Sequence, residues 1–205
     1  LPASLSLNRY YTKEFYLELR KILNNQGIAV FKTWGSLAYM SSELKRTNAE
    51  MLKTLTRAFP DVRVIPGDGF NMFLASKTKQ DYNPYILGAR LKYYDIDAYL
   101  INTDYLKLRL QEPYLQWFLA NTRSEIKNVA VNSDLKPAGL YETLSLFYSQ
   151  FSKKIPHFIG GFQKVKPRQL VFYIVLFFIF WWWKLRHAKT LKAAYGLTAF
   201  TTGTW

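Results

Sequence analysis

Residues 170–183 are the most restrictive feature of this sequence, because they form a run of fourteen apolar residues without a charge. At about 1.5 Å per residue, a helix of this run measures about 21 Å, which is shorter than the roughly 30 Å hydrocarbon core of a bilayer. Flanking Lys and Arg side chains can extend to the headgroups, and tryptophans favour the lipid interface, so we predict a transmembrane helix over residues 169–187. A buried core helix and a helix in the plane of the membrane are the alternatives. The residues expected at the membrane interface are Trp181, Trp182, Trp183 and Lys184.

The charge along the chain is distributed unevenly. Residues 1–142 contain nineteen Lys or Arg and all fourteen acidic residues, whereas residues 143–205 contain nine Lys or Arg and no acidic residue. The positive charge is therefore concentrated beside the apolar run. Lys and Arg in that position are attracted to anionic lipid headgroups by about 1 kcal/mol each. We predict a lipid bilayer with anionic headgroups as a partner, and no nucleic acid.

Cysteine is absent and only two histidines are present, His157 and His187. The missing thiols exclude a disulfide scaffold, a Cys-type zinc site and a thiol nucleophile. Both histidines stand alone in basic segments, so we expect no metal site.

The first eighty residues predict the order helix, strand, helix, strand, turn, strand. Pro66–Gly69 is a strong turn signal, so the last two strands are expected to form an antiparallel hairpin. The short apolar run 28–31 is typical of a buried parallel strand. This order predicts an α/β fold, the C-terminal half of a Rossmann-like, doubly wound sheet that ends in the hairpin. The elements are a helix between Thr12 and Asn24, strands at 28–31, 62–65 and 70–75, and a helix at 42–58 capped by Ser41 or Ser42.

The rest of the chain predicts helices at 83–94, 103–121 and 140–151, with a turn at Asp134 and Pro137 before the last of them. Pro156, Gly160, Gly161 and Pro167 indicate a broken linker. The predicted organisation is a Rossmann-like half domain (1–80), its helical extension (81–152), a basic linker (153–168), the transmembrane helix (169–187) and the start of a second membrane segment (188–205). We interpret both ends of the sequence as cut.

Five short motifs in order resemble the spermidine synthase family, a branch of which is membrane-bound in bacteria. In that branch an Asn-x-Asp-x-x-Pro segment follows the catalytic domain and precedes membrane helices. Asn132–Pro137 fits this segment, and Ala199–Gly203 looks like the start of the next membrane helix. The five motifs are Leu7–Tyr16, Gly27-Ile28, Phe59-Pro60, Val64–Gly67 and Phe73–Ser76.

The resemblance implies a class I methyltransferase-type domain that moves an aminopropyl group from decarboxylated S-adenosylmethionine to an amine acceptor. It places the glycine-rich donor loop and the catalytic base upstream of Leu1, so this chain is expected to hold no catalytic residue, to bind no cofactor alone and to be inactive alone. Because the donor is a cytosolic metabolite, the resemblance implies a bacterial inner-membrane protein whose α/β part faces the cytoplasm.

Four residues are candidates for binding the substrate by their positions in the resemblance: Asn8, Arg9, Lys32 and Asp68. The alternative role for Asn8 and Arg9 is to hold the loop in place. The alternative role for Asp68 is to stabilise the turn. Asn132 and Asp134 are predicted to form a polar segment near the membrane, with local capping of the next helix as the alternative.

Three departures from the family pattern concern the acceptor pocket. Leu1 stands where an acid is common, Lys32 stands where Gln is common, and the Pro66–Gly69 loop lacks a Tyr. Together they weaken the expectation of a polyamine acceptor, because a lysine repels a cation. Two other functions remain open: an S-adenosylmethionine-dependent methyltransferase acting on a membrane-proximal substrate, and a degenerate, non-catalytic membrane-tethered module.

Overall fold

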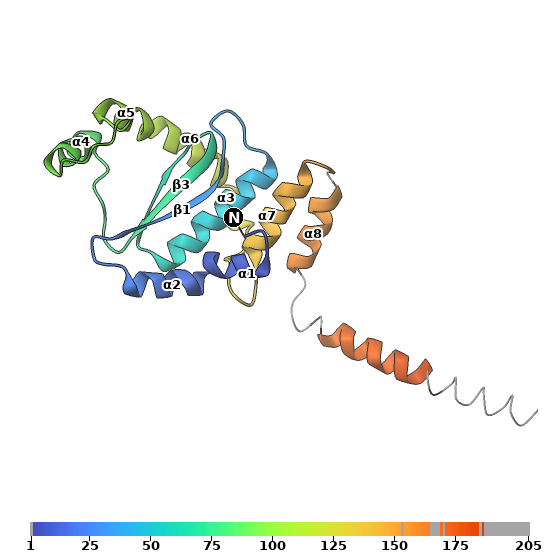
Figure 1. The fold of residues 1–205 in the computed structure, drawn as a ribbon. Coiled ribbons are helices and arrows are strands. Elements are labelled where there is room, and N and C mark those ends of the chain that lie inside the picture. Colours follow the sequence, from blue (N-terminus) through green and yellow to red (C-terminus); the bar gives the residue numbers. More distant parts are fainter. Residues whose placement is uncertain (1, 153, 165–168, 170, 185, 187–205) are drawn as a thin grey trace, which may run out of the picture. The chain divides into compact units, whose positions relative to one another are not determined.

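The computed structural model of the protein describes residues 2–152, 154–164, 169, 171–184 and 186 (Figure 1). The chain forms two units, Leu1–Gln163 and Lys164–Trp205. The first unit contains a three-stranded sheet and the labelled helices. The described part of the second unit is helical, and its longest described stretch is residues 171–184.

The chain begins with two short helices that lead into a longer one. Helix α1 (Leu5–Asn8) and the 3-10 turn η1 (Arg9–Tyr11) are followed by α2 (Lys13–Ile22). The hydroxyl of Thr12 accepts a hydrogen bond from the backbone N–H of Phe15 at 3.4 Å, which caps α2. The predicted cap is therefore confirmed.

The sheet consists of β1 (Ile28–Gly35), β2 (Asp61–Ile65) and β3 (Gly69–Ser76) in the order β1-β3-β2. Both pairings are antiparallel. The predicted hairpin is confirmed, because β2 and β3 pair antiparallel on either side of the turn. Gly69 adopts a φ of +83°, a conformation that glycine tolerates and other residues rarely adopt.

The prediction of a Rossmann-like, doubly wound α/β sheet is wrong. The described residues contain a three-stranded antiparallel sheet, and β1 pairs antiparallel with β3 rather than parallel with another strand. The apolar run at 28–31 is also not buried on both faces, since Ile28 is 42% and Val30 52% exposed. A short apolar run has the same appearance in either type of sheet, so the sequence pattern could not distinguish them.

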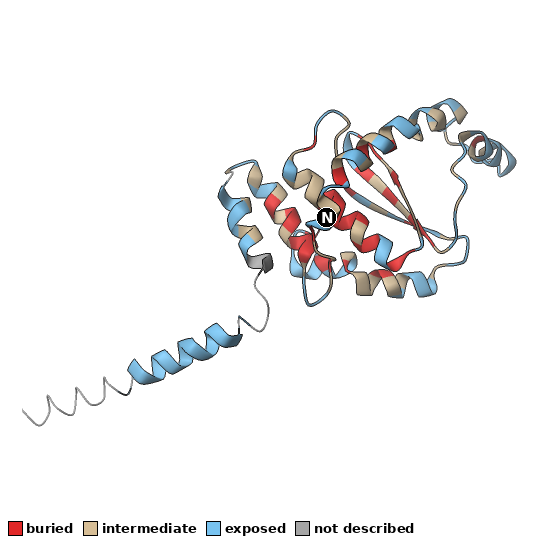
Figure 2. Ribbon diagram, turned by 180° about the vertical axis from the view of Figure 1, so that it is seen from behind, coloured by how far each residue is buried: buried red, intermediate tan, exposed pale blue. Residues whose placement is uncertain are grey.

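Helix α3 (Ser42–Ala58) forms the centre of the core. Its N-terminus is capped by the Ser41 hydroxyl, which accepts a hydrogen bond from Leu44 N–H at 3.2 Å, and it ends before Pro60, as predicted. Figure 2 shows buried residues concentrated on α3, on α7 (Ala138–Ser149) and on the sheet. The largest apolar core side chains include Tyr16, Met51, Leu55, Phe59, Phe73 and Phe118.

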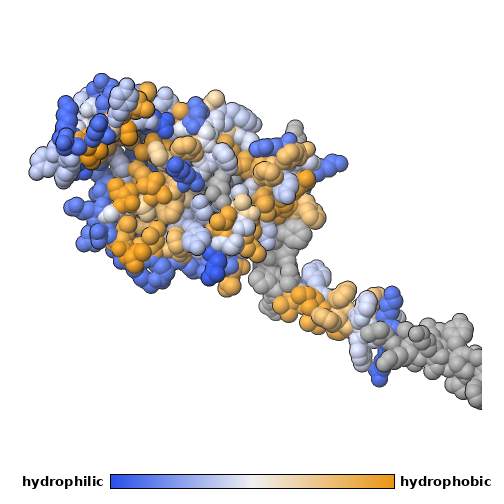
Figure 3. Space-filling view, in the orientation of Figure 1, coloured by the Kyte–Doolittle hydropathy of each residue, from blue (hydrophilic) through white to orange (hydrophobic). Residues whose placement is uncertain are grey.

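Helices α3 and α6 (Glu112–Thr122) pack on one side of the sheet, and the other side exposes apolar side chains. Trp34 of β1 and Phe70 of β3 are opposite each other in the register and both are exposed. Figure 3 shows hydrophobic surface gathered over the sheet on this side. One covered face is enough to fold the strands, and it explains why β1 alternates between buried and exposed residues.

The helices after the sheet differ from the prediction at two places. One helix was predicted at 103–121, but the chain forms α5 (Thr103–Arg109) and α6 (Glu112–Thr122), because Pro113 occupies the first turn of α6. The segment predicted as a broken linker instead contains α8 (Lys154–Lys164). Pro156 lies in the first turn of this helix, where backbone N–H groups have no hydrogen-bond acceptor within the helix, so the N–H that proline lacks is not missed. The remaining elements are α4 (Pro84–Tyr93), η2 (Glu125–Lys127) and α7 (Ala138–Ser149).

No helix among the described residues is both long enough and apolar enough to cross a membrane. The prediction of a transmembrane helix over residues 169–187 is therefore wrong for the part of the chain that the structure describes. The physical reason is length, since the sequence contains only fourteen consecutive apolar residues here, 170–183, and a helix of fourteen residues at about 1.5 Å each measures about 21 Å. Residues 188–205, which we predicted to begin a second membrane segment, lie outside the described residues.

Candidate functional site

A buried polar cluster connects the start of the first unit to its later helices. We define the polar cluster as Asn8, Glu50, Thr54 and Asn132. Asn8 ends α1, Glu50 and Thr54 lie one turn apart on α3, and Asn132 precedes α7. All four side chains are buried, with relative exposures between 0% and 4%.

Hydrogen bonds link these four residues in a chain. The side-chain amide of Asn132 donates to the Asn8 Oδ1 and to the Tyr11 carbonyl, both at 3.0 Å. The Asn132 backbone N–H donates to the Thr54 hydroxyl at 3.0 Å, and that hydroxyl donates to the Glu50 Oε1 at 2.8 Å. The Asn132 Oδ1 is buried and has no hydrogen-bond partner among the described residues. The cluster therefore fixes the segment before α7 to both α1 and α3.

The Glu50 carboxyl is the chemically unusual group of this cluster. Its pKa is raised to about 8, mainly by burial and in part by the nearby Glu142 carboxylate, and the hydrogen bond from Thr54 opposes this shift. At neutral pH the group is therefore mainly a neutral carboxylic acid. The space beside it is filled, because a Cβ added at Gly139 would lie 3.2 Å from the Glu50 Oε2 and 2.8 Å from the Asn132 Nδ2.

Next to the cluster, an ion pair joins α3 to α7. The Arg46 guanidinium donates to both carboxylate oxygens of Glu142, from Nε at 3.0 Å and from Nη2 at 2.6 Å. Its Nη1 lies 3.6 Å from a carboxylate oxygen of Glu125. The Glu142 side chain is only 2% exposed and the Arg46 side chain 30%. This two-point pairing fixes the geometry between the two helices.

Sequence reasoning missed Glu50, Arg46 and Glu142. For Glu50 the sequence offered one signal, its position in the middle of the apolar part of the helix. It precedes Met51 directly and Thr54 by four residues, within a helix that buries most of its residues. A carboxylate at such a position indicates a buried polar partner. For Arg46 and Glu142 no local signal exists, because 96 residues separate them.

The structure brings together two of the six polar candidates predicted from sequence. Asn8 and Asn132, which are 124 residues apart, form a direct hydrogen bond. The Asp134 backbone N–H donates to the Glu14 carboxylate at 3.2 Å, and its own side chain is exposed. Arg9 is also exposed, and its carbonyl accepts the Thr12 hydroxyl at 3.0 Å.

The two other candidates lie on the sheet and its hairpin. The Lys32 Nζ is 4.7 Å from the centre of the Phe70 ring on the exposed face of the sheet. Asp68 lies in the hairpin turn, where its carboxylate accepts the backbone N–H of Leu37 at 2.7 Å. Asp68 therefore holds the loop after β1, which is the turn role that we weighed as the alternative. The structure does not place Lys32 or Asp68 in the polar cluster.

The helix of residues 171–184 is the second candidate site. Trp181, Trp182 and Trp183 are 51%, 60% and 56% exposed, and the Arg186 guanidinium lies 4.8 Å from the centre of the Trp182 ring. Lys184, the last residue of the described stretch 171–184, is also exposed. An arginine stacked on an indole next to an apolar helix is an arrangement that suits the boundary between lipid and water.

No protein-family model, curated protein or solved structure matches this chain. The resemblance to the spermidine synthase family therefore stays a prediction from the motifs.

Proposed function

We propose that this chain is a membrane-tethered binding module whose helix of residues 171–184 inserts into the lipid interface. The supporting observation is the exposure of an uninterrupted apolar surface. Each side chain from Val171 to Trp183 exposes between 44% and 66% of its surface, and these residues face every direction around the helix. Isolated apolar side chains are common on protein surfaces, but a continuous surface of this kind marks an interaction site.

The chemistry of the helix favours lipid as the partner. A helix that is apolar all round is typical of a protein core or of a membrane environment. An apolar segment of this length is too short to span but suits an interfacial position. Its aromatic end and the following Lys184 and Arg186 fit anionic headgroups, and residues 143–205 carry no acidic residue that would oppose them.

We expect the full chain to float with vesicles of phosphatidylcholine and phosphatidylserine in a density gradient. Replacing Ile174 and Phe178 together by Asp is expected to lower the bound fraction at least about tenfold, because each buried aspartate opposes insertion by up to about 2.5–3.5 kcal/mol. The matched control replaces Tyr93 and Tyr99, two exposed aromatic residues of the first unit, by Asp. This control is expected to float like the unchanged chain.

Two results of this experiment would contradict the proposal. One is a chain that stays at the bottom of the gradient with every vesicle composition. The other is an Ile174→Asp/Phe178→Asp variant that floats as well as the control. High salt distinguishes the contributions, since it weakens attraction to phosphatidylserine and leaves apolar insertion in place.

Aminopropyl transfer is the second candidate function, and one observation favours it. The two segments that carry much of the resemblance, Leu7–Tyr16 and Asn132–Pro137, contact each other through Asn8 and Asn132. The two segments are therefore neighbours in the fold although they lie far apart in the sequence. The reaction itself, with decarboxylated S-adenosylmethionine as donor, is supported by the resemblance alone.

Donor binding tests this second candidate. Calorimetry would compare this chain with a form extended upstream of Leu1, titrated with a decarboxylated S-adenosylmethionine analogue. We expect saturable binding by the extended form and negligible binding by this chain, because the resemblance places the donor loop upstream. Negligible binding by both forms would remove the transferase proposal and leave the tethered module.

A further inference from the structure

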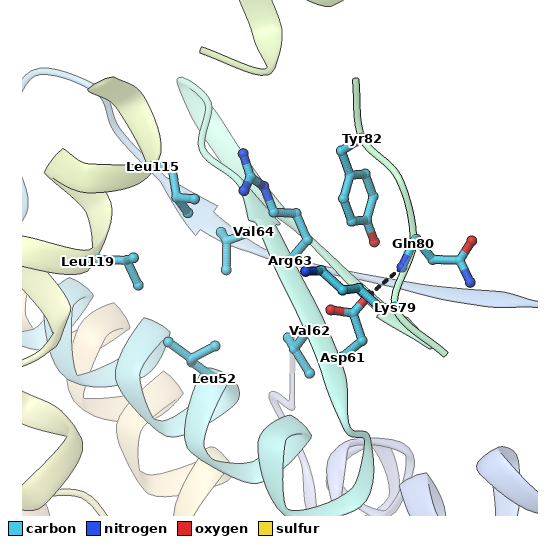
Figure 4. Close-up of a pocket in the computed structure, with 10 residues that line it drawn as sticks. All are labelled: Leu52, Asp61, Val62, Arg63, Val64, Lys79, Gln80, Tyr82, Leu115 and Leu119. Carbon is cyan, nitrogen blue, oxygen red and sulfur yellow. Dashed lines mark hydrogen bonds between the residues drawn. The ribbon is translucent and has the colours of Figure 1, made fainter. Parts of the chain in front are cut away.

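A cavity of about 240 Å³ lies along β2, an outer strand of the sheet (Figure 4). Successive residues of a strand point to opposite faces, yet four consecutive residues of β2 all line this cavity. The cavity therefore wraps around the free edge of the strand. The residues that line it are Leu52, Asp61, Val62, Arg63, Val64, Lys79, Gln80, Tyr82, Leu115 and Leu119.

The two sides of the cavity differ in chemistry. Figure 4 shows Leu52, Leu115 and Leu119 on one side of β2, where Val62 and Val64 also point. Arg63, Lys79 and Tyr82 lie on the other side. The cavity thus offers an apolar wall next to a polar one, which is the usual composition of a small-molecule site.

Two hydrogen-bond donors on the polar side lack an acceptor. The Arg63 Nε and the Tyr82 hydroxyl are buried and have no hydrogen-bond partner among the described residues. Buried donors are normally paired, so each of these groups needs an explanation. Burial and the nearby Asp61 carboxylate raise the pKa of Tyr82 to about 12, so its hydroxyl keeps its proton at neutral pH.

The carboxylate that the cavity contains is already engaged. The Asp61 Oδ2 accepts hydrogen bonds from the Ser76 hydroxyl at 3.2 Å and from the Gln80 backbone N–H at 3.1 Å. Outside the cavity lining, the Arg63 Nη2 lies 3.4 Å from the exposed Glu112 carboxylate, and this contact does not engage the Nε. The lining carries the cations Arg63 and Lys79 against the single carboxylate of Asp61, a net charge of 2 − 1 = +1, so it favours an anion over a cation.

We propose that this cavity binds a small monocarboxylic acid with an apolar body. The carboxylate accepts hydrogen bonds from Arg63 and Tyr82 and lies near the charge of Lys79, and the apolar body packs against Val64 and Leu115. Two oxygens bound to one carbon match two separated donors, because each donor takes one oxygen. The ligand class is opposite in charge to an amine substrate, so this site is independent of the functions proposed above.

Benzoate is a suitable probe, because it combines a carboxylate with an apolar ring of about the right size. Titrated into the full chain in detergent micelles and followed by NMR, benzoate is expected to give saturable shifts, whereas benzamidine, its cationic analogue, is not. Arg63→Met is expected to weaken benzoate binding at least about tenfold, and Tyr82→Phe about fivefold. Matched controls are Arg57→Met and Tyr39→Phe, which change an exposed arginine and an exposed tyrosine elsewhere.

The proposal is overturned if benzoate gives no saturable shift, if benzamidine binds equally well, or if the Arg63 and Tyr82 variants bind like the controls. Circular dichroism confirms that each variant is folded. If Arg63→Met is not folded, Tyr82→Phe, which removes a single hydroxyl, and Lys79→Met, at an exposed position, decide the outcome.

Discussion

Replacing Arg46 by Met is expected to lower the free energy of unfolding by about 2–3 kcal/mol. The change leaves the Glu142 carboxylate, which is 2% exposed, without the guanidinium that binds both of its oxygens. Removing one partner of a buried ion pair is destabilising by about 3–5 kcal/mol, and the 30% exposure of Arg46 places this pair at or below the lower end of that range. Urea denaturation of the purified chain measures the change.

The matched control for Arg46 is Lys21→Met, which removes an ion pair with Glu18 in which both side chains are about 70% exposed. This variant should change stability by no more than about 0.5 kcal/mol. The double variant Arg46→Met/Glu142→Met should recover much of the loss, because it no longer contains an unpaired buried charge. If Arg46→Met is no less stable than Lys21→Met, the pair does not hold α3 to α7.

Glu50→Gln is expected to stabilise the chain at alkaline pH and to have little effect in acid. The folded state raises the pKa of Glu50 from 4.5 to about 8, so it binds the proton more tightly than the unfolded state does. Stability of the unchanged chain therefore falls as the pH rises from about 4.5 to about 8, by ~1.4 kcal/mol for each pKa unit between the two states. Glutamine is neutral at every pH, so the variant should not show this fall.

Measuring the unfolding free energy from pH 5 to pH 9 in both chains tests this expectation. The difference between them should grow to a few kcal/mol at pH 9. Two titratable groups interact electrostatically with Glu50, namely Glu142 on α7 and Tyr16 on α2. The comparison assumes that these two groups contribute equally to the pH dependence of stability in both chains. Glu18→Gln, at an exposed position on α2, is the control and should leave the profile unchanged. Parallel profiles for Glu50→Gln and the unchanged chain would contradict a buried, neutral Glu50.

Local signals predicted the helix caps, the end of α3 and the hairpin turn correctly. Thr12 and Ser41 accept the expected capping hydrogen bonds, α3 ends before Pro60, and Pro66–Gly69 forms the turn between β2 and β3. Each of these features depends on residues within a few positions of one another. Their physical basis is the need to pair backbone groups at helix ends and turns, which a single sequence displays directly.

Pairings between distant segments could not be predicted in the same way. β3 lies between β1 and β2 and pairs antiparallel with both, so the whole sheet is antiparallel. No residue in the apolar run of β1 indicates which strand β1 pairs with. The polar cluster likewise depends on contacts such as Asn8 with Asn132, across 124 residues. The motifs singled out both asparagines, and for Asn8 they left open a substrate contact or a role in tying down the loop. The structure shows both side chains buried and hydrogen-bonded to each other, a contact that neither motif predicts alone.

Quenching of tryptophan fluorescence by lipids with brominated acyl chains tests most directly the central claim, that residues 171–184 insert into lipid. Bromine quenches only indoles that reach the acyl chains. We expect strong quenching with the unchanged chain and with Trp34→Phe, and its loss when Trp181, Trp182 and Trp183 are replaced together by Tyr. Equal quenching with and without these three tryptophans, or none with brominated vesicles, would contradict the claim that this helix tethers the protein to a membrane.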